Sequence, residues 1–356
     1  MTTMNKRWML LLLLILVTQQ GCRKNEQVAN LDELSGKVLH DVSVVVVHGS
    51  FQALKTQSDI FKNSISAYVA QPDQAHQEAA RVQWRAVRAA WEQCEGFLWG
   101  PVSTSGYDPR TDTWPINFTD MTAMLNDTVP ITDSLLTTLD DALKGYHPIE
   151  YLLWGTDGNR QPAALTAREW IYLTVLSNDL GRAIDDLYAA YDLSTGKSYL
   201  QHLLNPVSGG IYPTKRAAFE ELVNGISGIC EEVADGKIEE PFSQQEPTKE
   251  ESPYSKNSWV DFANNIRSVQ NVYMGQLGQT KGSGLSAFVH ETNASLDARI
   301  QSEIAVAIAS IEAVPVPFGD AIISHQTQVL AAQQAIRKLG STLSDDLLPL
   351  IQQHVK

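Results

Sequence analysis

The chain has few of the thiol side chains from which many metal sites and small secreted folds are built. It holds three cysteines in 356 residues. Only Cys94 and Cys230 lie beyond the N-terminal leader, and two cysteines cannot complete a thiolate cage around zinc. Both fall among apolar residues at helical spacing, so we predict two buried free thiols; a disulfide between them is the alternative.

Positive charge is also scarce. The chain carries 27 lysines and arginines against 41 aspartates and glutamates, a formal net charge of −14. Because binding to a phosphate backbone needs a concentrated basic surface, this balance argues against nucleic acid as a partner. The excess of carboxylates is typical of a soluble protein or of one that handles cations.

Long hydrophobic runs are missing except near the N-terminus, where the run is short. A basic stretch at residues 5–7 precedes an apolar segment at 8–17, which is too short to span a bilayer. Gly21 and Cys22 follow, and a small residue before a cysteine is typical of a bacterial lipoprotein cleavage site.

We therefore predict that residues 1–21 form a lipoprotein signal peptide and that Cys22 is lipidated as the first mature residue. Residues 22–35 are then a polar tether to the membrane. The alternative is an ordinary signal peptide with an incidental cysteine, because Gln19 stands where such sites usually have leucine.

Strand patterns are few. Val44–Val47 is a β-branched run, but its flanks keep helical spacing and the rest of the chain offers no partner strand. We predict an all-α protein, with amphipathic helices at 36–70, 73–99, 131–144, 165–192, 213–236, 257–275, 295–313 and 321–339. Stretches rich in proline, glycine and polar residues predict connections at 101–120, 155–164, 194–212, 240–256 and 278–284.

An internal repeat predicts two bundles. WRAVRAAWEQCEGFLWG at 84–100 and WVDFANNIRSVQNVYMG at 259–275 begin with tryptophan, end with glycine and share apolar positions three or four apart. The offset of 175 residues is constant along the pair. We predict a duplicated helical bundle, with one domain at 36–205 and the other at 206–356, whose halves meet around residue 147.

The stretch KGYHPIEYLLWG at 144–155 has two interpretations. In the first, Gly145 ends a helix in the left-handed conformation and Pro148 opens the next one. His147 then lies at the N-cap and Glu150 at the third helical position, which is the layout of a capping box.

In the second interpretation, His147 and Glu150 lie three apart on one helix face, where an imidazole and a carboxylate converge as a metal-binding pair. The zinc-protease patterns H-E-x-x-H and H-x-x-E-H are both absent, the second because Tyr151 replaces the histidine that it needs. Any further ligand must therefore come from another helix.

Glu95 is a candidate third ligand or hydrogen-bond partner of His147, because a core helix seldom buries a carboxylate without a partner. Ser255 and Asp261 open a helix of the second half, where they either face the pocket or cap the helix. Four other histidines are expected to be solvated or packed: His48, His202, His290 and His325. Arg85 and Arg88 are expected to lie at the surface or in ion pairs, and the acidic stretch 231–251 is expected to be a solvated helix end and loop.

Taken together, these patterns resemble the imelysin-like family. The motif G-x-H-x-x-E matches Gly145, His147 and Glu150. WEQCEGFLWGPV, DTWPINFTDM, YSKNSWVDFANNIRSVQNVYMG and KGSGLSAFV resemble further signatures, so that the resemblance covers nearly the whole mature chain. It implies an all-helical fold of two bundle-like domains and a pocket between them lined by the H-x-x-E pair. It also implies exported, often lipid-anchored proteins associated with bacterial iron acquisition, whose founding members were described as insulin-cleaving metallopeptidases.

We expect from this resemblance a lipid-anchored protein of the cell envelope, at the outer membrane, that binds iron, another divalent metal or an iron carrier at the interdomain pocket. One alternative is a metal-dependent peptidase that uses zinc at the H-x-x-E pair. Another is a structural partner of an outer-membrane uptake component, in which the motif only shapes a helix junction.

Overall fold

The computed structural model describes residues 30–356, which are predominantly helical, so the predicted all-α class is confirmed. The predicted signal peptide and Cys22 lie outside the described residues. Residues 30–41 are helical, so residues 30–35 of the predicted tether are part of a helix. Within the described range, no helix combines the length and the apolar character that crossing a membrane requires.

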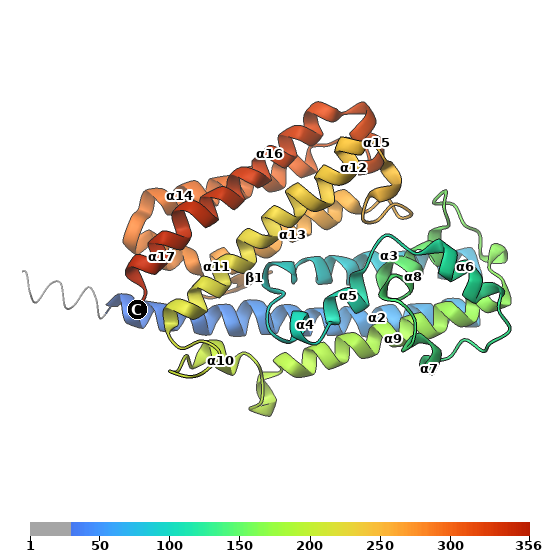
Figure 1. Ribbon diagram of the computed structural model, residues 1–356, viewed down its shortest axis with the longest axis horizontal. Coiled ribbons are helices and arrows are strands. Elements are labelled where there is room, and N and C mark those ends of the chain that lie inside the picture. The colour runs from blue at the N-terminus through green and yellow to red at the C-terminus, as the bar shows by residue number, and fades with distance from the viewer. Residues whose placement is uncertain (1–29) are drawn as a thin grey trace, which may run out of the picture.

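Three long helices form the lower layer in Figure 1. The first runs through residues 30–41 and η1 (Val42–His48, π-helical) into α2 (Gly49–Ala70), and it packs against α3 (Gln74–Glu92) and α9 (Ala167–Tyr191). The β-branched run at 44–47 is thus helical, as its flanks predicted. The predictions at 73–99 and 165–192 match α3 with the short turn η2 (Glu95–Phe97), and α9, respectively.

Short helices fill the chain between α3 and α9. Besides η2, they are α4 (Pro101–Thr104), α5 (Tyr107–Asp112), α6 (Phe118–Asn126), α7 (Asp133–Leu136), η3 (Asp141–Leu143), α8 (Tyr146–Trp154) and η4 (Pro162–Ala164).

The single helix predicted at 131–144 is wrong, because α7 ends at Leu136 and a separate 3₁₀ turn follows. The Thr132 and Asp140 side chains accept hydrogen bonds from backbone N–H groups at the starts of these two short helices. Such local bonds favour caps over a continuous helix.

The upper layer in Figure 1 holds the C-terminal helices. After η5 (Leu193–Thr195) and α10 (Gln201–Leu204) come α11 (Lys215–Glu231), η6 (Glu232–Ile238, π-helical), α12 (Glu239–Gln244), η7 (Pro247–Lys249), α13 (Ser258–Met274), a hairpin of β1 (Gln276–Leu277) and β2 (Thr280–Lys281), α14 (Leu285–Glu312), α15 (Phe318–Ser324), α16 (Gln326–Thr342), η8 (Leu343–Leu347) and α17 (Leu348–His354).

Two predicted helices of this layer need correction. The helix predicted at 295–313 begins at Leu285 and bends at Asn293, whose side chain caps the second part through the Leu296 N–H group. The helix predicted at 321–339 is two helices, α15 and α16, which meet at His325 in a non-helical conformation.

The two repeat segments lie against each other where the layers meet, because α13 packs on α3 and on η2, and α11 packs on η2. A further close contact joins α11 to the first segment: a Cβ on Gly225 would lie 2.5 Å from the backbone oxygen of Gly96. The division into domains at residue 205 stays a prediction, but this contact joins the segments on its two sides directly.

We predict that Gly225→Ala destabilises the protein by about 1–3 kcal/mol, because the added methyl group meets backbone that cannot rotate away. Gly228→Ala is the matched control on the same helix, where no atom lies within 4 Å of the added Cβ. It should stabilise by about 0.5–1 kcal/mol through helix propensity. Urea unfolding of both variants measures the difference, and equal shifts would contradict a close contact at Gly225.

Candidate functional site

The G-x-H-x-x-E stretch opens α8, and its first residue fixes where the helix begins. Gly145 has φ +78°, and a Cβ there would lie 1.9 Å from the Thr111 carbonyl oxygen. Only glycine fits this approach, which presses the end of α5 against the start of α8. The helix therefore begins at Tyr146.

The capping-box interpretation is wrong for this helix. Gly145 occupies the N-cap and makes no side-chain cap, so His147 is the second helical residue. Pro148 lies at the third position, where an N–H group has no helical partner to lose. Glu150 accepts hydrogen bonds from the Ser255 backbone N–H at 2.7 Å and hydroxyl at 2.6 Å, from the opposite layer.

His147 is buried between two carboxylates. Its Nε2 lies 3.0 Å from Asp112 Oδ1, and its Nδ1 lies 3.4 Å from Glu150 Oε2. Burial alone would lower the pKa of His147, but its hydrogen bonds with Asp112 and Glu150 raise that pKa to about 9. The ring is therefore protonated at neutral pH and bridges α5 to α8.

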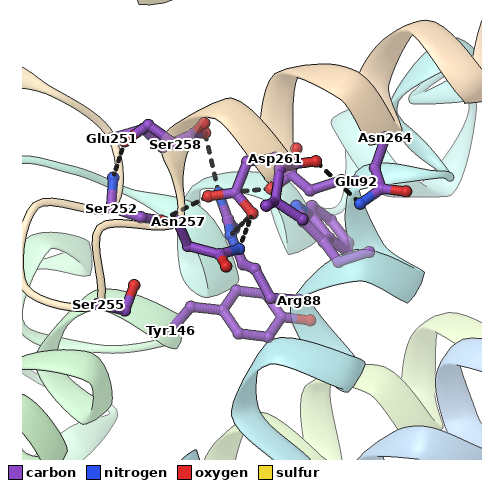
Figure 2. Close-up of polar contacts among 12 residues, drawn as sticks. Arg88, Glu92, Tyr146, Glu251, Ser252, Ser255, Asn257, Ser258, Asp261 and Asn264 are labelled. Carbon is purple, nitrogen blue, oxygen red and sulfur yellow. Dashed lines mark hydrogen bonds and ion pairs between the residues drawn. The ribbon is translucent and has the colours of Figure 1, made fainter. Parts of the chain in front are cut away.

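Arg88 gathers carboxylates from both layers around one guanidinium (Figure 2). Its Nη2 lies 2.5 Å from Glu92 and 2.9 Å from Glu251, its Nη1 pairs with Asp112, and its Nε is 3.8 Å from Asp261. The side chain is fully buried, so of the two roles expected for Arg88 the structure shows the ion-paired one.

The Tyr146 ring lies against the same guanidinium, 5.1 Å from ring centroid to Arg88 Cζ. Burial alone would lower the pKa of Arg88, but the surrounding carboxylates raise it well above its usual value. Arg88 is thus a permanent cation at the centre of the site.

Lys237 is the second buried cation. Its Nζ lies 2.9 Å from Glu251 Oε1, 3.0 Å from Glu95 Oε2, 3.5 Å from Asn265 Oδ1 and 3.7 Å from Glu92 Oε2. Glu95 is buried, as predicted, but in the described part of the chain it pairs with Lys237 and not with His147.

The buried cluster, as we call this group, holds more negative than positive charge. Six carboxylates face three cations, and all nine side chains are at most 3% exposed: Glu92, Glu95, Asp112, Glu150, Glu251, Asp261, Arg88, Lys237 and His147. Were every group ionised, three negative charges would remain without partners, at a high desolvation cost.

The carboxyl groups respond to this excess in different ways. Burial raises the pKa of Glu92 and of Glu95 well above the usual value, and burial raises the pKa of Asp261 to about 7. Burial would also raise the pKa of Asp112, yet Arg88 and His147 hold it well below its usual value. An arrangement of this kind can hold protons on its carboxyl groups or accept a further cation.

Three carboxylates of the cluster suit a metal ion. Glu92, Asp112 and Glu251 each offer an oxygen within 4.8 Å of the others. Glu92 Oε1 and Glu251 Oε2 are buried and make no hydrogen bond within the described residues, although Glu92 Oε1 lies close to Arg88. Such a set of hard oxygen donors fits iron, manganese or calcium better than a thiolate-seeking metal.

The second-half candidates both reach the cluster. Ser255 holds Glu150, and Asp261 accepts hydrogen bonds from the Ser252 hydroxyl and the Asn257 amide, each at 2.7 Å. Neither caps α13, whose N-cap residue Asn257 makes no side-chain cap. Asp261 still lies in the first turn of α13, where a carboxylate complements the helix dipole, so only side-chain capping by these two residues is excluded.

Four members of the cluster were missing from the sequence prediction. Glu92 lies four residues after Arg88 on one helix face, a spacing that could have revealed an ion pair. Asp112 was placed in a connection, while Lys237 and Glu251 belong to the stretch 231–251 that we expected to be solvated. That expectation is wrong at these two positions, which are buried.

The other candidates make their contacts elsewhere. Cys94 and Cys230 are buried free thiols, as predicted. Arg85 donates to the Ser255 carbonyl oxygen. The remaining histidines pair with or pack against neighbours outside the cluster: His48 with Asp192, His202 with Tyr199, His290 with Asp297 and His325 with Ser324.

Two hollows lie on the surface near the cluster. One of about 350 Å³ is lined by Trp114, Glu232, Glu240 and Lys237, among others, and thus reaches the cluster itself. The other, of about 560 Å³, lies between residues 115–156 and 247–320 and is walled by Phe118 and Tyr254. The predicted role of a pocket between the halves stays a prediction.

Comparison with known proteins adds to this geometry. The profile of the imelysin family, peptidase M75, matches residues 47–343. An iron-regulated protein A from Synechococcus elongatus is 31% identical over 312 residues, which cover 86% of this chain and 84% of that protein.

Two solved structures share the fold. An iron-regulated protein A precursor from Parabacteroides distasonis superposes with a TM-score of 0.80 at 23% identity, over 91% of this chain and 96% of that one. An imelysin-like protein from Psychrobacter arcticum gives 0.73 at 14% identity, over 90% and 96%. At these identities the likeness shows the fold alone.

We predict that Gly145→Ala disrupts the cluster by pushing Thr111, and with it Asp112, away from His147. Gly106→Ala is the control, because Gly106 also has positive φ, +68°, but no atom lies within 4 Å of an added Cβ. The control should cost about 1–2 kcal/mol of unfolding free energy. Gly145→Ala should cost at least about 2 kcal/mol more. Equal costs in urea unfolding would count against the contact.

Proposed function

Because this chain belongs to the imelysin family, we propose that it serves iron handling by binding a hard metal cation, foremost iron, in the buried cluster. The observation that carries the proposal is the charge excess: six buried carboxylates face only three cationic side chains. The name of the relative from Synechococcus elongatus, an iron-regulated protein, points the same way.

Glu92, Asp112 and Glu251 are the residues that we propose as ligands. A bound metal would supply the positive charge that the carboxylates lack, and these oxygens would hold it as a hard cation. His147 then acts as a positioning residue, because its Nε2 holds Asp112 Oδ1. Glu150 and Ser255 in turn hold His147 from the opposite side of the site.

The surroundings of His147 favour this role over the peptidase alternative. Both ring nitrogens face carboxylates, and the pKa of the ring is raised to about 9. A zinc ligand needs a neutral imidazole with a free nitrogen. The binding of an iron carrier instead of a bare ion would involve the hollows near Trp114 and Tyr254.

The test is metal binding by the purified chain and its variants. We expect the wild type to bind Fe²⁺ without oxygen, or Mn²⁺ as a stable substitute, in one-to-one stoichiometry. Asp112→Asn should weaken the affinity at least about 100-fold, and Glu150→Gln about 10- to 100-fold as a positioning residue. Calorimetric titration and elemental analysis measure both.

Asp345→Asn is the matched control, because Asp345 is an exposed aspartate outside the cluster. It should leave the affinity unchanged. Absence of binding in the wild type, or an equal affinity in Asp112→Asn and Asp345→Asn, would overturn the proposed metal site.

A lipid anchor at Cys22 is the proposal for localisation. The basic stretch, the short apolar segment and the Gly21-Cys22 pair support it, and the described helices begin eight residues after Cys22. We propose that this anchor holds the protein in the cell envelope, at the outer membrane, where an uptake component is its partner.

We predict that Cys22→Ser moves the protein from the membrane fraction to the soluble envelope fraction, because a serine cannot take the thioether-linked lipid. Fractionation with detection of the chain measures this, and Cys230→Ser is the control for loss of a thiol. A Cys22→Ser variant that stays in the membrane fraction would contradict the lipid anchor.

A further inference from the structure

The ammonium group of Lys237 occupies an oxygen cage. Oxygens of Glu251, Glu95, Asn265 and Glu92 surround its Nζ at 2.9 to 3.7 Å. The side chain is 1% exposed. These contacts make the ammonium group the counter-ion of the surrounding carboxylates.

The cage overlaps the proposed metal site, because Glu92 and Glu251 belong to both. Glu251 also carries a buried oxygen, Oε2, that has no hydrogen bond in the described chain, whereas Glu92 Oε1 is ion-paired with Arg88 at 2.5 Å. An ammonium group makes three hydrogen bonds at most. A metal ion of higher charge takes six or more oxygens and can use Glu251 Oε2, which the ammonium leaves without a hydrogen bond.

Lys237 differs from Arg88 in having a route out of the cluster. It projects from the π-helical segment η6 and lines the hollow of about 350 Å³, at whose edge Glu232 Oε1 lies 3.8 Å from its Nζ. Glu232 is half exposed, and Glu240 lines the same hollow. A displaced ammonium therefore meets both water and carboxylates.

The Trp114 ring lines this hollow and lies close to both Lys237 and His147. Its centroid is 5.5 Å from Lys237 Nζ and 6.1 Å from the centroid of the His147 ring. An aromatic face holds a cation weakly in comparison with carboxylates, so it offers a departing ammonium an intermediate contact.

We propose that Lys237 is an internal counter-ion that an incoming metal cation displaces into the hollow lined by Glu232 and Glu240. This inference rests on the proposed function, and it deepens that function by making metal uptake an exchange of one cation for another. With every group ionised, a trivalent ion in place of the ammonium would leave one uncompensated negative charge where the metal-free cluster has three.

The exchange predicts that removing the charge of Lys237 raises the affinity of the site for a metal cation. Tb³⁺ is the probe, as a trivalent hard cation that stays soluble at neutral pH. In the wild type, part of the binding free energy is spent on displacing the Lys237 ammonium group. The Lys237→Met variant has no ammonium group to displace. We therefore expect Lys237→Met to bind Tb³⁺ at least about tenfold more tightly than the wild type in calorimetric titration.

Lys338→Met is the matched control, since Lys338 also pairs with a buried glutamate, Glu303, at 3.4 Å, but lies on α16 outside the cluster. It should change the Tb³⁺ affinity less than about twofold. An unchanged or weaker affinity of Lys237→Met, with a wild type that binds, overturns the exchange alone. Failure of both the wild type and Lys237→Met to bind overturns the proposed metal site as well.

A measurement on the wild type keeps the proposal testable if Lys237→Met does not fold. Reductive methylation of lysines, read by mass spectrometry, should modify Lys237 slowly in the metal-free protein and at least about tenfold faster with saturating Tb³⁺. Lys338, which is 70% exposed, should react fast in both states. Equal protection of Lys237 with and without Tb³⁺ would refute the displacement.

Discussion

The burial of one guanidinium is the constraint on which the rest of the site depends. Arg88 cannot lose its proton, so a position with no solvent exposure requires carboxylates from whatever segments surround it. They come from α3, from the end of α5 and from the connection before α13, which lie far apart along the chain. Folding around Arg88 therefore ties the two layers together and creates, as a consequence, a region where negative charge is concentrated beyond what the cations balance.

Such a cluster is a poor way to stabilise a fold. The desolvation of buried ions offsets most of their attraction, and apolar side chains of similar volume are often as stable or more so. The core already has the apolar material, since Trp84, Trp91 and Phe262 are fully buried nearby. A site where local rules of burial are broken while the rest of the chain follows them is where function is expected. This reasoning concerns the cluster as a whole and does not depend on which ion it receives.

The sequence predicted correctly the long helices in which buried apolar residues recur at helical spacing. The segments at 165–192 and 257–275 match α9 and α13 within about two residues, because their apolar stripes continue for several turns. Asp112 and Glu251 could not be found in this way, since short irregular segments have no period from which burial could be inferred. The prediction for the start of α8 was wrong because a tertiary contact fixes it. This contact, between Gly145 and the Thr111 carbonyl, joins positions 34 residues apart in the sequence.

The geometry also shows a structural role for each residue of the motif G-x-H-x-x-E, which the sequence alone did not reveal. Gly145 lets the end of α5 approach α8, and this places Asp112 beside His147. The three-residue spacing puts Glu150 against the other ring nitrogen, and Ser255 of the opposite layer binds Glu150 in turn. Asp112 also pairs with Arg88, so the motif links three segments of the chain to the permanent cation at the centre of the site. A histidine held by two carboxylates is suited to fixing the positions of these segments, whereas a histidine that binds a metal needs a free ring nitrogen. This is why our proposal puts the additional cation on the acid-rich side of Arg88 and not on the imidazole.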